Sequence, residues 1–180
     1  MSADAAVKIP QPPERWADAA PKRQTGSARP SNEQGQALDR RDLHSLTMNH
    51  KQRVQEVMGA MSQGRVAPLL EAMAQDVTWR WMGVNQWSQT FEGKQIVVEK
   101  LFGGATETLA PSSSIEVRRV HADGDYVVVE HSGRNEMSDG RRYDNNYCWV
   151  LRFQNGLIQE VREYMDTQLV TETFGADASQ

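Results

Sequence analysis

The sequence has little cysteine, no long hydrophobic run and no excess of positive charge, and each of these shortages excludes a class of function. The single cysteine, Cys148, rules out an intramolecular disulfide framework and a cysteine-rich metal site. No apolar run approaches the roughly 20 residues that a membrane-spanning helix requires, so no membrane partner is expected. The net charge of −4 argues against nucleic acid as a partner, because phosphate binding needs clustered basic residues.

The usual sequence signatures of metal and phosphate sites are also missing. No histidines and carboxylates have the spacing of metal ligands, and no glycine-rich phosphate loop or internal repeat is present. We therefore expect neither a metal nor another cofactor. The amino-terminal stretch lacks the apolar segment of a secretory signal, which favours a cytoplasmic protein.

Residues 1–47 are predicted to form a disordered extension. They hold five of the seven prolines and one aromatic residue, Trp16, so they cannot bury enough apolar surface to offset the entropy of ordering. A short helix over residues 36–46, a docking arm around Trp16 and a natural start at Met48 are the other interpretations. The folded domain is expected over residues 48–175, with a tail at 176–180.

The stretch from Gly140 to Asp166 predicts a long β-hairpin, because Asn155-Gly156 is a strong hairpin-turn signal. Side chains two apart on a strand share a face. The aromatic face of the first strand would carry Tyr143, Asn145, Tyr147, Trp149, Leu151 and Phe153, and the matching face of the second would carry Leu157, Gln159, Val161, Glu163 and Met165. Glu163 thus stands among apolar neighbours, where a carboxylate must be paired, protonated or functional.

The remaining elements predict an α+β domain in which helices pack on one face of a curved sheet. Helices are expected over Lys51–Gln63, Arg65–Ala74, Lys94–Phe102 and Gln168–Phe174, and further strands over Val77–Met82, Ser112–His121 and Tyr126–Glu136. Gly103-Gly104 is expected to end the third helix. The last four strands should be antiparallel, since hairpin signals connect them.

Three segments resemble the nuclear transport factor 2-like superfamily. They read DVTWRW at 76–81, FEGKQIV at 91–97 and NNYCWVLRFQNGLIQEVREYMD at 145–166. Residues 49–174 are most similar to its SnoaL-like group, which contains polyketide cyclases and relatives of ketosteroid isomerase and limonene-epoxide hydrolase. The resemblance implies a cone-shaped α+β domain with a curved antiparallel sheet packed against N-terminal helices, a pocket between them, and a homodimer.

The same resemblance places Glu163 at the acidic position of the pocket, because residues 162–166 match the last-strand pattern of the epoxide-hydrolase branch. Other positions of that branch are not matched. Trp79 and Trp81 stand where it has a water-holding tyrosine and asparagine, and Glu130 and Ser132 replace its Arg-x-Asp pair. Epoxide hydrolysis by that mechanism is therefore disfavoured. In phenazine-biosynthesis relatives a glutamate near this position acts as an acid or base, which favours Glu163 in that role.

The sequence leaves open which face of the strand Tyr126–Glu136 lines the pocket. One face carries Glu130 and Arg134, which would form a charged group with Glu163. The other carries His131, which would pair with Glu163 as a proton shuttle. The ungapped match to the family favours the first face.

Together these residues predict proton transfer without a cofactor on a small apolar, carbonyl-bearing or cyclic metabolite, by isomerisation, cyclisation or dehydration. Glu163 would move the proton, Arg134 or Tyr147 would stabilise the oxyanion, and Trp79 and Trp81 would hold the ring. The candidate binding residues also include Asn145, Glu130 and His131.

The alternative is a non-catalytic ligand-binding or dimerisation module. Neutralisation of Glu163 by one arginine would favour that alternative, and a Glu163 free beside Tyr147 would favour catalysis.

Overall fold

The computed structural model of the protein describes residues 40–110 and 112–175. All of these residues belong to one compact unit. The disorder expected for the amino-terminal extension therefore concerns mostly residues outside the described part, as does the tail at 176–180.

The described unit follows the expected α+β order. Its helices are α1 (Arg40–Met61), α2 (Ala67–Ala72), α3 (Lys94–Ile96), the π-helical segment η2 (Val97–Phe102), α4 (Gly103–Thr108) and α5 (Thr167–Phe174). Its strands are β1 (Met73–Trp81), β2 (Thr90–Glu92), β3 (Ser114–Asp123), β4 (Tyr126–Arg134), β5 (Asn146–Gln154) and β6 (Leu157–Met165).

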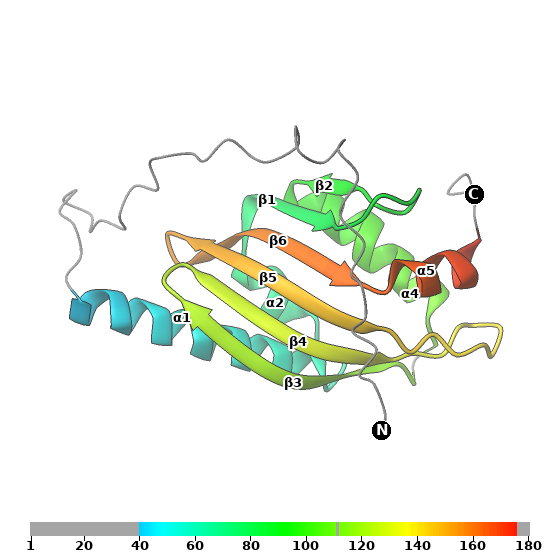
Figure 1. Ribbon diagram of the computed structural model, residues 1–180, viewed down its shortest axis with the longest axis horizontal. Coiled ribbons are helices and arrows are strands. Elements are labelled where there is room, and N and C mark those ends of the chain that lie inside the picture. The colour runs from blue at the N-terminus through cyan, green and yellow to red at the C-terminus, as the bar shows by residue number, and fades with distance from the viewer. Residues whose placement is uncertain (1–39, 111, 176–180) are drawn as a thin grey trace, which may run out of the picture. The chain divides into compact units, whose positions relative to one another are not determined.

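The strands form one curved six-stranded sheet in the order β2-β1-β6-β5-β4-β3 (Figure 1). Strands β3 to β6 make the expected antiparallel meander, whereas β1 pairs with β6 in parallel. The sheet is therefore mixed rather than wholly antiparallel. This parallel pairing brings Trp79 and Trp81 of β1 alongside Val161 and Glu163 of β6, and so builds part of the site.

The turn between β5 and β6 has the predicted form. Asn155 and Gly156 have φ angles of 52° and 75°, as a type I′ turn requires. A β-bulge near Phe153 then shifts the pairing of β5 with β6. As a result Ile158 is buried, whereas Leu157 and the half-buried Gln159, both expected on the inner face, do not join the core. Beyond the bulge the alternation agrees with the sequence.

The first and third helices differ from their predictions. Helix α1 begins at Arg40 rather than after Asn49, so the boundary expected between residues 47 and 48 falls within it. The extra turns are held because Thr47 and His50 contact the carbonyl oxygen of Gly124, and the His50 ring stacks on Phe153 at 4.3 Å. None of the described helices is long and apolar enough to cross a membrane.

The third helix does not end at Gly103-Gly104. The helical run from α3 through η2 and α4 continues to Thr108, because both glycines adopt right-handed helical backbone there. The run therefore extends along the inner side of the sheet and forms one wall of the site described next.

Candidate functional site

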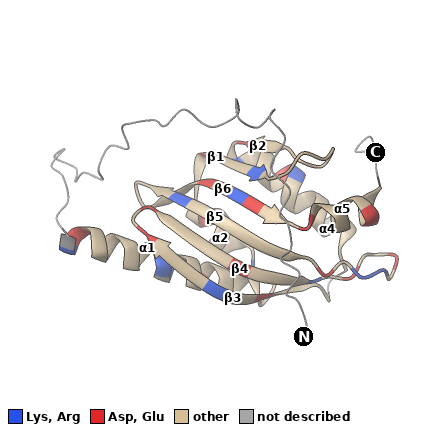
Figure 2. Ribbon diagram, viewed as in Figure 1, with Lys and Arg blue, Asp and Glu red and all other residues tan. Residues whose placement is uncertain are grey.

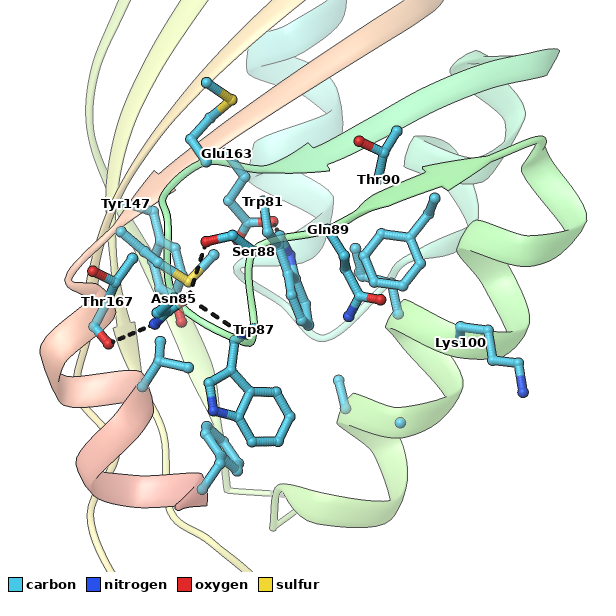
Figure 3. A pocket seen from close by; sticks show the side chains of 18 of the residues that line it. Trp81, Asn85, Trp87, Ser88, Gln89, Thr90, Lys100, Tyr147, Glu163 and Thr167 are labelled. Atoms are coloured by element: carbon cyan, nitrogen blue, oxygen red, sulfur yellow. Dashed lines mark hydrogen bonds between the residues drawn. The ribbon is translucent and has the colours of Figure 1, made fainter. Parts of the chain in front are cut away.

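A cavity of about 800 Å³ lies between the inner face of the sheet, the helical run 94–108, helix α5 and the loop 83–89 (Figure 3). From the sheet, Trp81, Tyr147, Trp149, Glu163 and Met165 line it. Its walls are mainly aromatic and aliphatic, which is typical of pockets for small organic ligands.

Glu163 is the buried carboxylate of this cavity, and two tryptophans hold it. Its side chain is only 6% exposed. The indole N–H groups of Trp79 and Trp81 donate to the same oxygen, Oε2, over 2.6 and 2.8 Å. The geometry follows from the β1–β6 register, which sets Trp81 opposite Glu163 and points both indoles to the inner face. No described residue donates a hydrogen bond of standard geometry to the other oxygen, Oε1, and Glu163 lines the cavity.

Burial raises the pKa of Glu163 above its usual value of 4.5, because desolvation disfavours the charged form. The indoles of Trp79, Trp149 and Trp81 oppose this and lower the pKa, but the burial effect is larger. The Trp149 N–H lies near enough to contribute, yet it makes no hydrogen bond of standard geometry to a described residue. No ion pair to Glu163 is formed by an arginine, lysine or histidine of residues 40–110 and 112–175, so the carboxyl is not neutralised by a fixed cation of that part of the chain.

Two tyrosines stand beside Glu163 in the cavity. The Tyr143 hydroxyl oxygen accepts a hydrogen bond from Asn145 Nδ2 at 3.2 Å and a long one from the Tyr147 hydroxyl at 3.5 Å. Burial raises the pKa of both phenols, so they stay protonated. Because the Tyr143 oxygen accepts twice and donates to no described group, its own proton is free to bond to a ligand. The sequence predicts a role for Tyr147, whereas it places Tyr143 on the inner face without indicating a role.

Asn145 is a positioning residue rather than the binding residue that we expected. It is 1% exposed and does not line the cavity. Its Nδ2 donates to the carbonyl oxygen of Asp166 at 3.1 Å, and its Oδ1 accepts from the Asp166 N–H at 3.0 Å. These bonds join the start of β5 to the end of β6 and hold Tyr143 in place.

Strand β4 presents the opposite face to the one favoured by the ungapped match. Val127, Val129 and His131 are buried on the inner side, and Glu130 and Arg134 lie on the outer side. Arg134 forms an exposed ion pair with Glu116 at 3.4 Å and does not line the cavity. The expected charged group of Glu130, Arg134 and Glu163 is therefore wrong, because burial of the valine face determines the register.

His131 faces the interior but does not form a proton shuttle with Glu163. Its ring stacks on Tyr147 at 4.9 Å and meets Trp149 edge-on at 4.7 Å. Neither ring nitrogen has a hydrogen-bond partner among the described residues, and burial lowers the pKa of His131 from 6.5 to about 4. The imidazole is thus neutral at pH 7 and packs behind Tyr147 rather than lining the cavity.

The two β1 tryptophans have different positions. Trp79 is fully buried and packs edge-on against Trp149 at 4.8 Å, so it supports Glu163 from within the core and does not hold a ligand ring. Trp81 lines the cavity, as expected for an aromatic wall, and packs against Phe91.

The loop 83–89 contributes to the cavity although the sequence showed no motif there. Asn85 Nδ2 donates to the carbonyl oxygen of Thr167 at 3.1 Å (Figure 3). It also donates to the Thr171 hydroxyl at 3.2 Å, and the Trp87 indole donates to the carbonyl oxygen of Gly175 at 3.0 Å. Trp87 also contacts Phe174. These partners are more than 80 residues away in the chain, so local sequence patterns cannot indicate them.

Within residues 40–110 and 112–175, no group of three or more histidine, cysteine, aspartate or glutamate side chains is arranged to hold a metal ion. The cavity lining offers one carboxyl, two phenols, the amine of Lys100, hydroxyl and amide groups, and aromatic walls.

The raised pKa of Glu163 predicts that the variant Glu163→Gln gains stability relative to the wild type as the pH rises. Below pH 4.5 the carboxyl is protonated in both the folded and the unfolded wild type. Above it the unfolded chain releases the proton and the folded chain keeps it, so wild-type stability falls until the folded-state pKa is passed. Each unit of raised pKa corresponds to about 1.4 kcal/mol. Urea unfolding of both proteins at pH 4 and pH 8 measures their free energies of unfolding. If the difference between the two proteins were the same at both pH values, the prediction would be contradicted.

Comparison with known proteins gives a family and a fold. Residues 54–161 match the family model of the SnoaL-like domain. An NTF2-like protein of unknown function from Burkholderia pseudomallei K96243 superposes with a TM-score of 0.60 at 22% identity, over 69% of this chain and 95% of that chain. No curated protein sequence matches the chain.

Two further solved structures carry provisional functional names. A protein provisionally named SnoaL-like polyketide cyclase, from Jannaschia sp. CCS1, has a TM-score of 0.59 at 16% identity, over 81% of this chain and all (100%) of that chain. A provisionally named isomerase from Bacillus subtilis has a TM-score of 0.60 at 19% identity, over 74% of this chain and 97% of that chain. At these identities the likeness establishes the fold alone.

Proposed function

Because the chain belongs to the SnoaL-like domain family, we propose that its cavity binds a small cyclic metabolite and that Glu163 transfers a proton on it without a cofactor. The reaction class is isomerisation, cyclisation or dehydration. The observation that carries this proposal is the buried Glu163 carboxyl, which lines the cavity with one oxygen held by two indoles and no fixed cation of the described chain paired to it. The provisional names of the two relatives above support the same class of reaction.

Each group has a defined part in the proposed step. Glu163 Oε1 takes a proton from a carbon next to a ligand carbonyl, and the electrons of the C–H bond move onto the carbonyl oxygen. The Tyr143 O–H donates to that oxygen and stabilises its negative charge, with Tyr147 supporting Tyr143. Glu163 then returns the proton to a different carbon of the enolate, the electrons on the oxygen form the carbonyl again, and the double bond has moved, which completes an isomerisation. Burial raises the pKa of Glu163, which makes its carboxylate a stronger base toward the ligand carbon.

The walls of the cavity favour a flat, largely apolar ligand. Aromatic side chains surround it, from the sheet, the loop and α5: Trp81, Trp87, Phe91, Tyr147, Trp149 and Phe174. Rings of this kind bind planar ligands by stacking and edge contacts, while the carboxyl and the phenols fix the orientation.

A thermal-shift screen tests the proposal. Cyclic ketones, sterols, polyketide-like aromatics and small epoxides are screened against the wild type and Glu163→Gln. A true ligand stabilises the folded state by about 2.7 kcal/mol at one hundred times its dissociation constant, so at least one class should raise the melting temperature of the wild type. The shift should differ in Glu163→Gln, because the ligand touches that carboxyl. If no class stabilises either protein, the proposal is wrong.

The alternative is a non-catalytic binding or dimerisation module, which would not exchange the protons of a bound ligand. The outer face of the sheet exposes Tyr126 and Tyr164. It is otherwise partly charged, and Figure 2 shows basic and acidic segments on β5 and β6, where Arg152 and Arg162 pair with Glu160. Homodimerisation through this face stays a prediction of the family resemblance. The absence of an arginine partner for Glu163 in the described chain weighs toward catalysis.

A further inference from the structure

The helical run that walls the cavity carries a glycine in the middle of its inner stripe. Leu101, Gly104, Ala105 and Thr108 all line the cavity. These positions are three and four residues apart, so they lie on one face of the helix. A side chain at position 104 would therefore project toward the ligand space.

Neither the backbone nor the packing explains glycine at position 104. The residue lies in a right-handed helix and has no positive φ, so any residue could adopt its conformation. A Cβ atom built there would meet no atom of the described chain within 4 Å, so no described neighbour requires the space. Glycine is also among the least favourable residues for a helix interior. What glycine does at this position is to leave room in the cavity and to expose helix backbone to whatever fills it.

We propose that Gly104 sets the size of ligand that the cavity accepts, with the far rings of a flat ligand lying against the helix backbone at Gly104 and the reacting end at Glu163. This inference rests on the proposed function. The ligand class is a planar molecule of more than two fused rings with a hydroxyl or carbonyl group at one end. A cavity of about 800 Å³ is near the upper end of the roughly 300–1,000 Å³ seen for small-molecule pockets, so it has room for a ligand of this size.

Substitution at Gly104 separates this role from a purely structural one. Gly104→Ala adds a methyl group without strain and should make the helix more stable, while the same methyl group takes space from the ligand. Stability and affinity for a large ligand should thus change in opposite directions. Gly59→Ala is the matched control, because Gly59 is also helical with no described atom within 4 Å of an added Cβ, but lies in α1 away from the cavity.

The experiment is a fluorescence titration of the full chain with two phenols, 2-naphthol with two rings and 1-hydroxypyrene with four. The wild type, Gly104→Ala, Gly104→Leu and Gly59→Ala are compared, and their melting temperatures are measured in parallel. We expect Gly104→Leu to weaken 1-hydroxypyrene by about 10-fold or more and Gly104→Ala by about 3-fold, in line with the effect of overpacking a filled site. Binding of 2-naphthol should change by less than about 2-fold, and Gly59→Ala should bind both phenols as the wild type does.

The possible failures are distinguishable. If the wild type binds both phenols and the Gly104 variants weaken neither, or weaken both equally, the size limit is overturned and the proposed function stands. If the wild type binds neither phenol, both the size limit and the ligand cavity of the proposed function are contradicted. A higher melting temperature of Gly104→Ala together with unchanged binding of 1-hydroxypyrene would assign Gly104 no role in ligand selection.

Discussion

Replacing Glu163 with glutamine is expected to slow the exchange of a ligand's α-protons with solvent by about 10²- to 10⁴-fold, the range that a positioned general base contributes. Glutamine keeps the shape of the side chain, and its amide oxygen can still accept from the Trp79 and Trp81 indoles. It cannot take a proton at pH 7. The loss should therefore fall on the proton-transfer step, with ligand binding largely retained.

The reaction to follow is deuterium uptake by 2-tetralone in D₂O, measured by NMR, since this ketone is cyclic, partly aromatic and enolisable. Glu130→Gln is the matched control, because Glu130 lies on the outer face of β4 and does not line the cavity. Exchange by the control should equal that of the wild type. Equal rates for the wild type and Glu163→Gln, above the uncatalysed rate, would show that Glu163 is not the base.

The second large effect is expected from His131, which should make the wild type lose stability in mild acid. The folded-state pKa is lowered to about 4 from 6.5. The contribution of neutral His131 to the free energy of unfolding is therefore fully present above pH 6.5. It is lost as the pH falls toward 4, because only the unfolded chain takes up the proton between these two pH values. A difference of about 2.5 pKa units corresponds to about 3 kcal/mol. The variant His131→Phe, which keeps a ring against Tyr147, should lose less stability over the same range.

Denaturant unfolding at intervals between pH 7.5 and 4 measures this difference. His121→Phe is the control, since His121 lies exposed on β3 and its replacement should leave the pH dependence of the wild type in place. Parallel stability curves for the wild type and His131→Phe would contradict the lowered pKa. They would instead indicate that a partner of His131 relieves the cost of its burial.

Those features of the fold that depend on local patterns could be predicted from the sequence. The Asn155-Gly156 turn follows from backbone sterics alone, and alternation along β5 and along β6 beyond the bulge correctly predicts Tyr147 and Glu163 on the inner face. Segment motifs indicate the family, and with it the α+β arrangement, which the structure confirms.

The predictions that were wrong concern features that depend on contacts between distant segments. The face of β4 could not be chosen from its own residues, because Glu130 and His131 fit a pocket equally well until the burial of Val127 and Val129 decides the register. Glycine propensity predicted a helix end at Gly103-Gly104, but both glycines adopt helical backbone and the run continues to Thr108.

Long-range partners also changed the roles of the predicted site residues. Trp79 and Trp81 were expected to hold a ligand, yet the parallel pairing of β1 with β6 turns both indole N–H groups toward Glu163. A strand pairing of this kind is invisible in either segment alone. Sequence patterns thus locate the acid but not the groups that hold it.

The most direct test of the account is a ¹³C NMR titration of the Glu163 carboxyl, assigned by the signal that disappears in Glu163→Gln. We expect a titration midpoint above 4.5 and a change in that midpoint when 2-tetralone is added, since the carboxyl is buried and lines the ligand cavity. A midpoint at or below 4.5 that does not respond to 2-tetralone would contradict it.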